Sequence, residues 1–329
     1  MKLQHIIGAD LSKKKIDLVC HLFQTHIQID NTVKGFKDLL RWMRQQKINL
    51  SQIMMVMEHP GLYSYCFEDF LHRHKIAFCK VNALAIKRSI GLVRGKTDKL
   101  DAARIAAYGY EKKDKLKADV PINDILKRLQ MLHSTRDRLV RQRASLLCAI
   151  KEYRHIGISD KDIIMQTQLQ LIKNFDKQIE KLVTEMESII DQQKELKQNF
   201  QLLQSISGVG RVVSLVTIIK THNFTRFANA RKFACFCGTA PFEHSSGTSI
   251  KKKSRISHLA DKQMKTLLDL SAKSAIQYDK ELREYYLRRT TDGKSKMSTI
   301  NIVRNKILYR MFAVIKRQTP FSVNYLQVA

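Results

Sequence analysis

The sequence predicts an α/β amino-terminal domain followed by a predominantly helical remainder. The first part alternates short apolar runs with amphipathic stretches of helical period, which is typical of strands and helices that share one sheet. The middle part is polar, has helical periodicity and contains no glycine except Gly157. The last part is a series of amphipathic helices around glycine-containing turns. We therefore expect three regions, with bounds at residues 1–118, 119–200 and 201–329.

A net charge of +29 is the most unusual compositional feature of this 329-residue chain. Such a charge favours a polyanionic partner, because each neutralised phosphate releases counterions. Between Ser246 and Ala329 there are 18 Lys and Arg against 6 Asp and Glu, so the excess is not confined to a short tail. Hydrophobic residues make up 44% of the chain, which is enough for buried cores. The composition indicates a globular nucleic-acid-binding protein.

The sequence contains no sign of a membrane or secreted protein. No apolar run reaches the roughly 18 residues of a membrane-spanning helix, and the first 15 residues turn polar too early for a signal peptide. None of the six cysteines forms a CxxC pair. We expect a cytoplasmic, reduced protein without zinc and without a membrane partner.

The amino-terminal region is predicted to have the element order βββαβαβα. Strand patterns cover 2–10, 13–23, 25–30, 52–58 and 76–82. Helix patterns cover 32–46, 62–74, 83–93 and 98–112. This order is that of a ribonuclease H-like (RuvC-like) domain, in which the first and fourth strands lie side by side.

Four carboxylates fall where such a domain would bring them together. Asp10 ends the first strand and Glu58 ends the fourth, while Asp98 and Asp101 lie three apart in a predicted helix and share one face. Converging carboxylates repel one another unless a cation lies among them, and hard oxygen ligands suit Mg²⁺ or Mn²⁺. Two such ions stabilise the attacking and leaving oxygens of a phosphoryl displacement. The set predicts a metal-dependent enzyme that acts on nucleic acid.

The middle region contains two helices with apolar positions at alternating steps of four and three, and a break near 151–162. The first series, interrupted by Arg136 and Arg143, is Ile125, Leu129, Leu132, Leu139, Leu146 and Ile150. The second series is Phe175, Ile179, Leu182, Met186 and Ile189. This spacing is typical of a coiled coil. An antiparallel hairpin within one chain and a contact between two chains both fit it.

The carboxyl-terminal region begins with two apolar helices joined by a Gly-Val-Gly turn, over 202–219. A helix-hairpin-helix-like element of this kind lets the backbone at Gly208 and Gly210 approach a phosphate. Alternatively, the two glycines only cap core helices. Further helices are predicted almost to the end of the chain.

Residues 241–258 lack apolar periodicity and are predicted to form an exposed loop. Ser246 precedes a glycine there and is followed by Lys251, Lys252, Lys253 and Arg255. An accessible serine beside cations is what nucleophilic attack on a phosphodiester requires. The loop has no obvious general base, although His244 and His258 are nearby. A flexible phosphate-binding loop is the other interpretation.

Taken together, these segments resemble the transposases of the insertion sequence 110 family, which are related to Piv-type DNA invertases. The amino-terminal resemblance lies in GADLSKKKIDL, MEHPGLY and KTDKLDAARIA. The carboxyl-terminal resemblance lies in SISGVG, NFTRFANARKFACFCGTAPFEHSSG, ISHLADKQMKTLL, YDKELREYYLRR and GKSKMSTINIVRNKILYRMFAVIKRQTPF. It covers nearly the whole chain, in matching order.

The resemblance assigns roles to individual residues. It implies that Asp10, Glu58, Asp98 and Asp101 bind Mg²⁺, and that Ser246 is a nucleophile that links covalently to DNA. It also implies a structured noncoding bridge RNA that pairs with donor and target DNA, in a bacterial, nucleoid-associated enzyme. Homodimers would join through the middle helices and combine into tetramers, with the carboxylate domain of one subunit facing the serine of another.

Two other functions fit parts of the sequence. A ribonuclease H-like nuclease or junction resolvase would use water as its nucleophile, but that function leaves the carboxyl-terminal half unexplained. A nucleic-acid-binding structural protein with a decayed active site is less consistent with a complete carboxylate set. Dependence on Mg²⁺ and a covalent DNA intermediate separate these alternatives.

Overall fold

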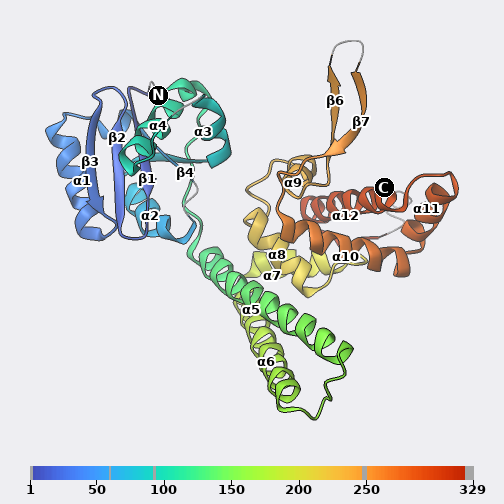
Figure 1. Ribbon diagram of the computed structural model, residues 1–329. Helices are drawn as coiled ribbons and strands as arrows, with labels where there is room; N and C mark the ends of the chain where they lie inside the picture. Colours follow the sequence, from blue (N-terminus) through green and yellow to red (C-terminus); the bar gives the residue numbers. More distant parts are fainter. Residues whose placement is uncertain (1–2, 59–60, 92–93, 247–249, 323–329) are drawn as a thin grey trace. The chain divides into compact units, whose positions relative to one another are not determined.

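The computed structural model describes residues 3–58, 61–91, 94–246 and 250–322, and the side chains of 244–253 lie outside that description. The chain folds into two compact units, Met1–Ile122 and Asn123–Ala329, which are treated separately below. The first is a mixed α/β unit and the second is mainly helical (Figure 1).

The first unit is built on a five-stranded sheet with the order β3-β2-β1-β4-β5. Its strands are β1 (His5–Leu11), β2 (Lys15–Cys20), β3 (Thr25–Asp30), β4 (Ile53–Glu58) and β5 (Ala77–Val81). The first three strands form an antiparallel meander, whereas β4 runs parallel to both β1 and β5. The predicted neighbourhood of the first and fourth strands is therefore confirmed.

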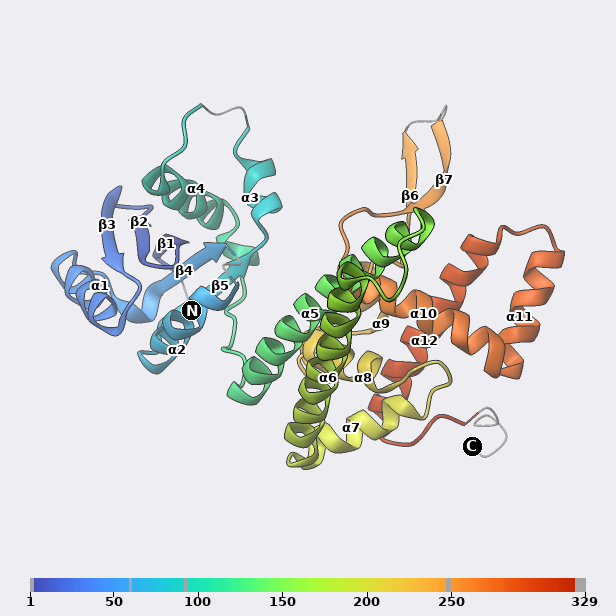
Figure 2. The ribbon, with the colours of Figure 1, turned by 60° about the horizontal axis from the view of Figure 1, so that its bottom comes forward.

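Helices cover both faces of this sheet (Figure 2). They are α1 (Val33–Gln45), α2 (Tyr65–Arg73), α3 (Ala83–Ser89) and α4 (Asp98–Glu111). Because side chains alternate along a strand, Ile7 and Met55 enter the core beneath α1 and α2. Ile6 and Val56 enter the core on the other face, beneath α3 and α4. The same alternation fixes the face on which each strand-end carboxylate lies.

The second unit begins with a helical hairpin of α5 (Asp124–His155) and α6 (Ile163–Asp191), which pack side by side (Figure 1). Gly157 lies in the connection with φ of +85°, a conformation that favours glycine. Ile150, Met165 and Ile172 form a small core of their own. At Leu129 and Met186 the hairpin instead joins the main core of the unit. The structure thus contains the intrachain hairpin, and the coiled coil and the contact between chains stay predictions.

The remaining helices complete this core. They are α7 (Lys194–Gln204), α8 (Arg211–Thr221), α9 (Ala230–Phe236), α10 (Lys262–Tyr278), α11 (Lys280–Thr291) and α12 (Lys296–Arg317). Helix α12 packs against α7, α9, α10 and α11, and it buries Val303, Ile307 and Met311 completely. None of the helices in the described residues combines the length and apolar character that crossing a bilayer would require.

The prediction of a loop over 241–258 is wrong. Strands β6 (Pro241–Ser246) and β7 (Ile250–Ile256) form a two-stranded antiparallel ribbon, called the β6–β7 ribbon below (Figure 1). Backbone hydrogen bonds between the two strands define this ribbon. Phe242, at the foot of the ribbon, is 44% exposed and so is not part of a core. Because none of the described side chains of these strands belongs to the buried core, we expect no apolar alternation of the kind by which a half-buried strand is recognised.

Candidate active site

Asp10 and Glu58 lie side by side at the carboxyl ends of two parallel strands. The register pairs Ala9 of β1 with Met57 of β4, so the next residues are neighbours. Ala9 and Met57 belong to the core beneath α1 and α2. Asp10 and Glu58 therefore lie on the opposite face, which α4 covers.

Two glycines allow α4 to pack directly on the strands beneath it. A Cβ atom on Gly8 would lie 2.2 Å from the carbonyl oxygen of Ala102, and one on Gly109 would lie 2.7 Å from Cγ2 of Val56. Both distances are too short for a side chain. The close approach brings the first turn of α4 to the end of β1.

The first turn of α4 contains the other two predicted ligands. Thr97 caps the helix, since its Oγ1 accepts a hydrogen bond from the backbone N–H of Leu100 at 3.2 Å. Asp98 and Asp101 follow within this turn, where the positive end of the helix dipole favours carboxylates. The sequence therefore starts the helix where these two side chains can approach Asp10.

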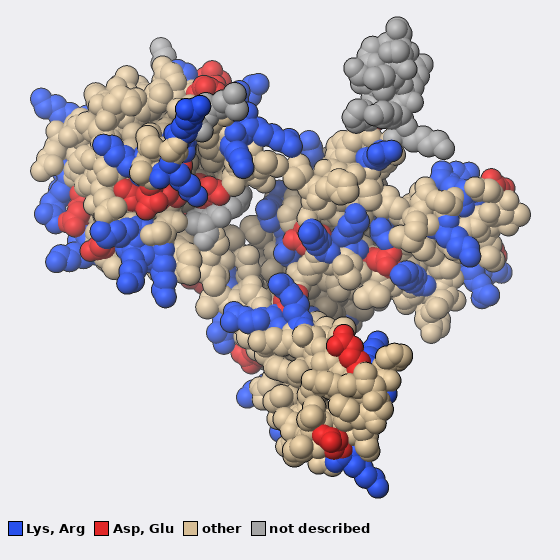
Figure 3. Space-filling model, in the orientation of Figure 1, with Lys and Arg blue, Asp and Glu red and all other residues tan. Residues whose placement is uncertain are grey.

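The negative charges of the other three carboxylates act on Asp10. The pKa of Asp10 is raised from 3.8 to about 6, first by burial and then by the negative charges of Asp98, Asp101, Glu58 and Asp17. On the face of this unit shown in Figure 3, a band of Asp and Glu is bordered by Lys and Arg. An acidic centre with basic borders can hold a cation and attract a polyanion.

The donor set fits a hard divalent cation, although it is not closed around one. It consists of carboxylate oxygens whose mutual repulsion a cation would relieve. In the parts of the chain that the structure describes, no three His, Cys, Asp or Glu side chains already form a ligand group. Asp101 is instead paired with Arg104, whose Nη1 lies 2.8 Å from Oδ1 and whose Nη2 donates to the carbonyl of Gly95 at 2.9 Å. Asp101 would exchange this arginine for a cation.

Sequence reasoning missed Asp17 and Arg104. Asp17 lies directly opposite Asp10 in the β1–β2 register and is only 4% exposed. It accepts hydrogen bonds from His26 Nε2 at 2.7 Å and from Gln28 Nε2 at 3.0 Å. The sequence signal that could have revealed Asp17 was a carboxylate within the apolar run of a predicted strand. The pairing of Arg104 with Asp101 also agrees with the rule that side chains three residues apart on a helix can interact.

The serine and the basic cluster predicted beside it lie on the β6–β7 ribbon. Ser246 is the last residue of β6, and its backbone pairs with Ile250. The side chains of Ser246, Lys251, Lys252 and Lys253 lie outside the described residues. Arg255 is described and exposed, and it lines a hollow at the foot of the ribbon.

The two glycines of the Gly-Val-Gly turn differ in their surroundings. Gly208 has φ of +83°, and a Cβ atom there would lie 2.3 Å from the carbonyl oxygen of Ser271 in α10. This glycine therefore has a packing role. Gly210 is exposed, precedes α8, and has no atom within 4 Å of an added Cβ. Only Gly210 leaves a helix start open to a phosphate.

Two family models match the chain in sequence order. A DEDD transposase model of the IS110 type matches residues 7–153, which include all four carboxylates. A second model, described as the transposase IS116/IS110/IS902 family, matches residues 200–287, which include Ser246.

Curated relatives match over most of the chain. The pilin gene-inverting proteins of Moraxella bovis and Moraxella lacunata are each 27% identical over 333 aligned residues, covering 96% of this chain and 97% of the relative. An uncharacterized insertion element IS110 protein of Streptomyces coelicolor is 28% identical over 121 residues, which are 37% of this chain and 30% of that protein.

Proposed function

Because the chain belongs to the IS110 family of transposases and is a DNA recombinase, we propose that it cuts and rejoins DNA through a covalent serine intermediate assisted by a divalent cation. Asp10, Glu58, Asp98 and Asp101 would hold Mg²⁺, or Mn²⁺, and Ser246 would be the nucleophile. The relatives named for pilin gene inversion extend the range of products to inversion of a DNA segment.

The chemistry assigned to the serine conserves the energy of the phosphodiester bond. Ser246 Oγ attacks the scissile phosphorus, a phosphoserine bond forms, and a DNA 3′-oxygen leaves as a hydroxyl after taking up a proton. The 3′-hydroxyl of the second duplex then attacks the phosphoserine and releases the serine. When bound, the cation would stabilise the negative charge that develops on the phosphate. No ATP is required in this scheme.

The single observation that supports this proposal is the convergence of carboxylates on Asp10. Partial burial disfavours a charge at Asp10, yet three further carboxylates, from β4 and α4, act on this same strand end. An ion pair with a cation lowers the pKa of a carboxylic acid, whereas neighbouring carboxylates raise it. Clustered carboxylates with raised pKa values are typical of metal or catalytic sites.

The proposed partners follow from the family. Donor and target DNA would be bound together with a noncoding bridge RNA that pairs with both. The enzyme would act as a homodimer that assembles into a tetramer. A chain with a net charge of +29 is suited to hold several nucleic-acid strands. Base pairing would then select the sequence while the protein binds mainly backbone, the division of labour known for RNA-guided nucleases.

The experiment compares two conservative substitutions in the same unit. Asp10→Asn removes a proposed ligand, whereas Asp38→Asn removes a carboxylate from α1, on the other face of the sheet. Strand transfer between labelled donor and target DNA is measured in Mg²⁺ with the element's noncoding RNA. We expect Asp10→Asn to abolish transfer and Asp38→Asn to retain it. Full activity of Asp10→Asn would refute the metal site.

A further inference from the structure

A hollow of about 650 Å³ lies at the foot of the β6–β7 ribbon, entirely within the second unit. Ribbon residues Ser254 and Arg255 line one part of it, followed by His258 from the segment after β7. Lys294 and the first turns of α12, including Ser298, line the rest. Its volume lies in the range of ligand-binding pockets and is too small for a double helix.

The foot of the ribbon is firmly attached to α12. The side-chain amides of Asn301 and Asn305 both donate to the carbonyl of Thr239, each at 2.9 Å. Arg231 Nη2 donates to the carbonyl of Pro241 at 3.1 Å. The hollow is therefore framed by anchored backbone, which favours a preformed site over a chance gap.

The lining of the hollow has positive charge and no carboxylate. Arg304, which also lines the hollow, is ion-paired with Asp269 of α10. Arg255 and Lys294 form no ion pair within the described residues, and no described Asp or Glu lines the hollow. Two other arginines of this unit are compensated: Arg211 pairs with Glu187, and Arg310 pairs with Asp279 at 2.6 Å. Unpaired cations facing one hollow repel each other, and an anion between them removes that cost.

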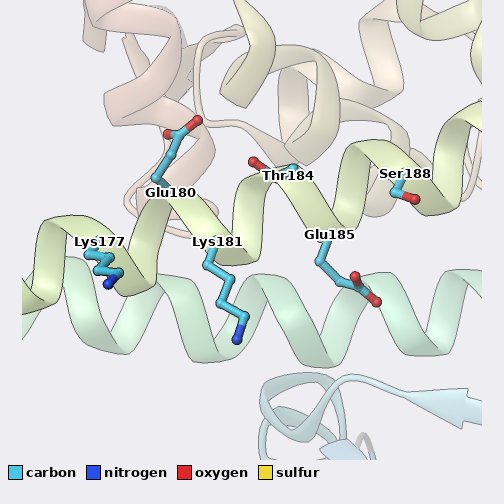
Figure 4. A pocket seen from close by; sticks show the side chains of 6 residues that line it. All are labelled: Lys177, Glu180, Lys181, Thr184, Glu185 and Ser188. Carbon is cyan, nitrogen blue, oxygen red and sulfur yellow. The ribbon is translucent and has the colours of Figure 1, made fainter.

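A second hollow in the same unit gives a useful contrast (Figure 4). It lies on α6, has a volume of about 560 Å³, and is lined by both signs of charge. Lys177 and Lys181 alternate there with Glu180 and Glu185, and Lys181 and Glu185 point to the same side (Figure 4). A hollow of similar size can thus be charge-balanced in this protein.

The chemistry of the hollow at the ribbon foot suits one strand of nucleic acid. Guanidinium, ammonium and hydroxyl groups are the usual donors to phosphate oxygens. Met297 and Ile302 add an apolar wall against which a sugar or base can rest. Lys and Arg side chains also gather over the neighbouring α11 (Figure 3).

We propose that the hollow at the ribbon foot binds the sugar-phosphate backbone of a single nucleic-acid strand, away from the phosphate that is cleaved. Pro241 at the foot and Ser246 at the end of β6 are five positions apart, a length of about 17 Å in a strand. The hollow therefore holds the strand and takes no part in bond breaking. This inference rests on the proposed function for the presence of a nucleic-acid substrate and for the position of the cleaved phosphate at Ser246.

The test measures binding in EDTA, where no cleavage occurs. Labelled single-stranded DNA and RNA of one sequence are titrated with the full chain at several KCl concentrations. The double variant Arg255→Gln, Lys294→Gln is compared with Lys177→Gln, Lys181→Gln, which removes the same charge from the hollow on α6. We expect the first double variant to bind more weakly, with a slope of log affinity against log salt shallower by about 1.4, or 0.7 for each lost phosphate contact.

A third variant separates binding from folding. Ser295 caps α12 by accepting a hydrogen bond from the N–H of Ser298 at 3.3 Å. Ser298→Glu completes a capping box, so it should preserve or raise stability while it places a negative charge in the hollow. We expect binding to weaken at least about tenfold, by repulsion of phosphates.

Equal losses in both double variants, or unchanged binding in Ser298→Glu, would overturn the proposal. A loss confined to RNA or to DNA would support it and identify the strand. Because EDTA prevents catalysis, this result does not depend on whether Ser246 forms an adduct. Failure of the serine mechanism would therefore be seen separately, in the recombination assay.

Discussion

Asp10 combines burial with the repulsion of neighbouring carboxylates, and both effects disfavour its ionised form. Its pKa of about 6 in the folded chain lies above the ordinary value of 3.8. The folded state therefore holds this proton more tightly than the unfolded state does. The resulting stability is fully present below pH 4 and is lost as the pH rises through 6.

Asp10→Asn, which stays neutral, should consequently be more stable than the parent chain at pH 7.5 but not at pH 4. We expect a difference in unfolding free energy of about 1–2 kcal/mol at pH 7.5 without divalent cations, allowing for solvent screening. Urea denaturation followed by the fluorescence of Trp42 measures it, because this single tryptophan lies in the core of the first unit. An equal difference at both pH values would contradict the assigned pKa.

A divalent cation should remove most of this difference in stability. At Mg²⁺ ten times above its dissociation constant, the parent chain should gain about 1.4 kcal/mol, since binding to the folded state alone stabilises it. Asp10→Asn should gain much less, whereas Asp38→Asn should respond like the parent. The same Trp42 signal reports all three proteins. If Mg²⁺ stabilised Asp10→Asn as strongly as the parent, the cation would have to bind elsewhere.

At the residue scale, the sequence was sufficient to nominate Asp10, Glu58, Asp98 and Asp101 because each lies at an element end or on one helical face. Asp17 could not be found in this way. Its position opposite Asp10 depends on the β1–β2 register, which is a property of the folded sheet. The side-chain pairing of Arg104 with Asp101 was compatible with their spacing, but spacing does not choose among several possible partners.

At the scale of elements, the contact between α4 and β1 positions the site. Gly8→Ser should destabilise the first unit by about 1–3 kcal/mol, because the new side chain would overlap backbone atoms of α4. It should also displace Asp98 and Asp101 and so reduce Mg²⁺-dependent transfer. Gly210→Ser is the matched control for stability, since space is open there and serine is a favourable cap for α8.

Urea denaturation tests both variants, and strand-transfer rates are measured for Gly8→Ser against the parent chain. A Gly8→Ser protein with parental stability and activity would show that α4 need not lie so close to β1. Loss of stability in the control alone would likewise contradict the packing account. Trp42 reports the first unit, and far-ultraviolet circular dichroism reports all helices, most of whose residues lie in the second unit.

Periodicity predicted the elements that bury a face and failed for the ribbon. The strands of the five-stranded sheet and the long helices contribute to cores, so their apolar spacing was informative. Strands β6 and β7 are joined by a backbone ladder, which leaves no such pattern. The turn at Gly208 was predicted, but its contact with α10 depends on packing that sequence does not encode locally.

At the scale of the whole molecule, charge dominates the interaction with nucleic acid. With a net charge of +29, affinity for non-specific duplex DNA should fall steeply with salt, by about 10³–10⁵ between 50 and 200 mM if six to ten phosphates are contacted. Fluorescence anisotropy measures the slope. Asp10→Asn should retain it, because the carboxylate acts in chemistry and not in general attraction. A salt-independent affinity would contradict an electrostatic mode of binding.

The central claim is that DNA becomes covalently bound to Ser246. The most direct measurement is a denaturing gel of labelled donor and target DNA after incubation with the protein, the noncoding RNA and Mg²⁺. The account predicts a protein–DNA adduct that disappears in EDTA and in Ser246→Ala. The adduct should persist when the preceding serine is replaced, in Ser245→Ala. Cleavage without an adduct, undiminished by Ser246→Ala, would contradict it and indicate a hydrolytic nuclease that uses water.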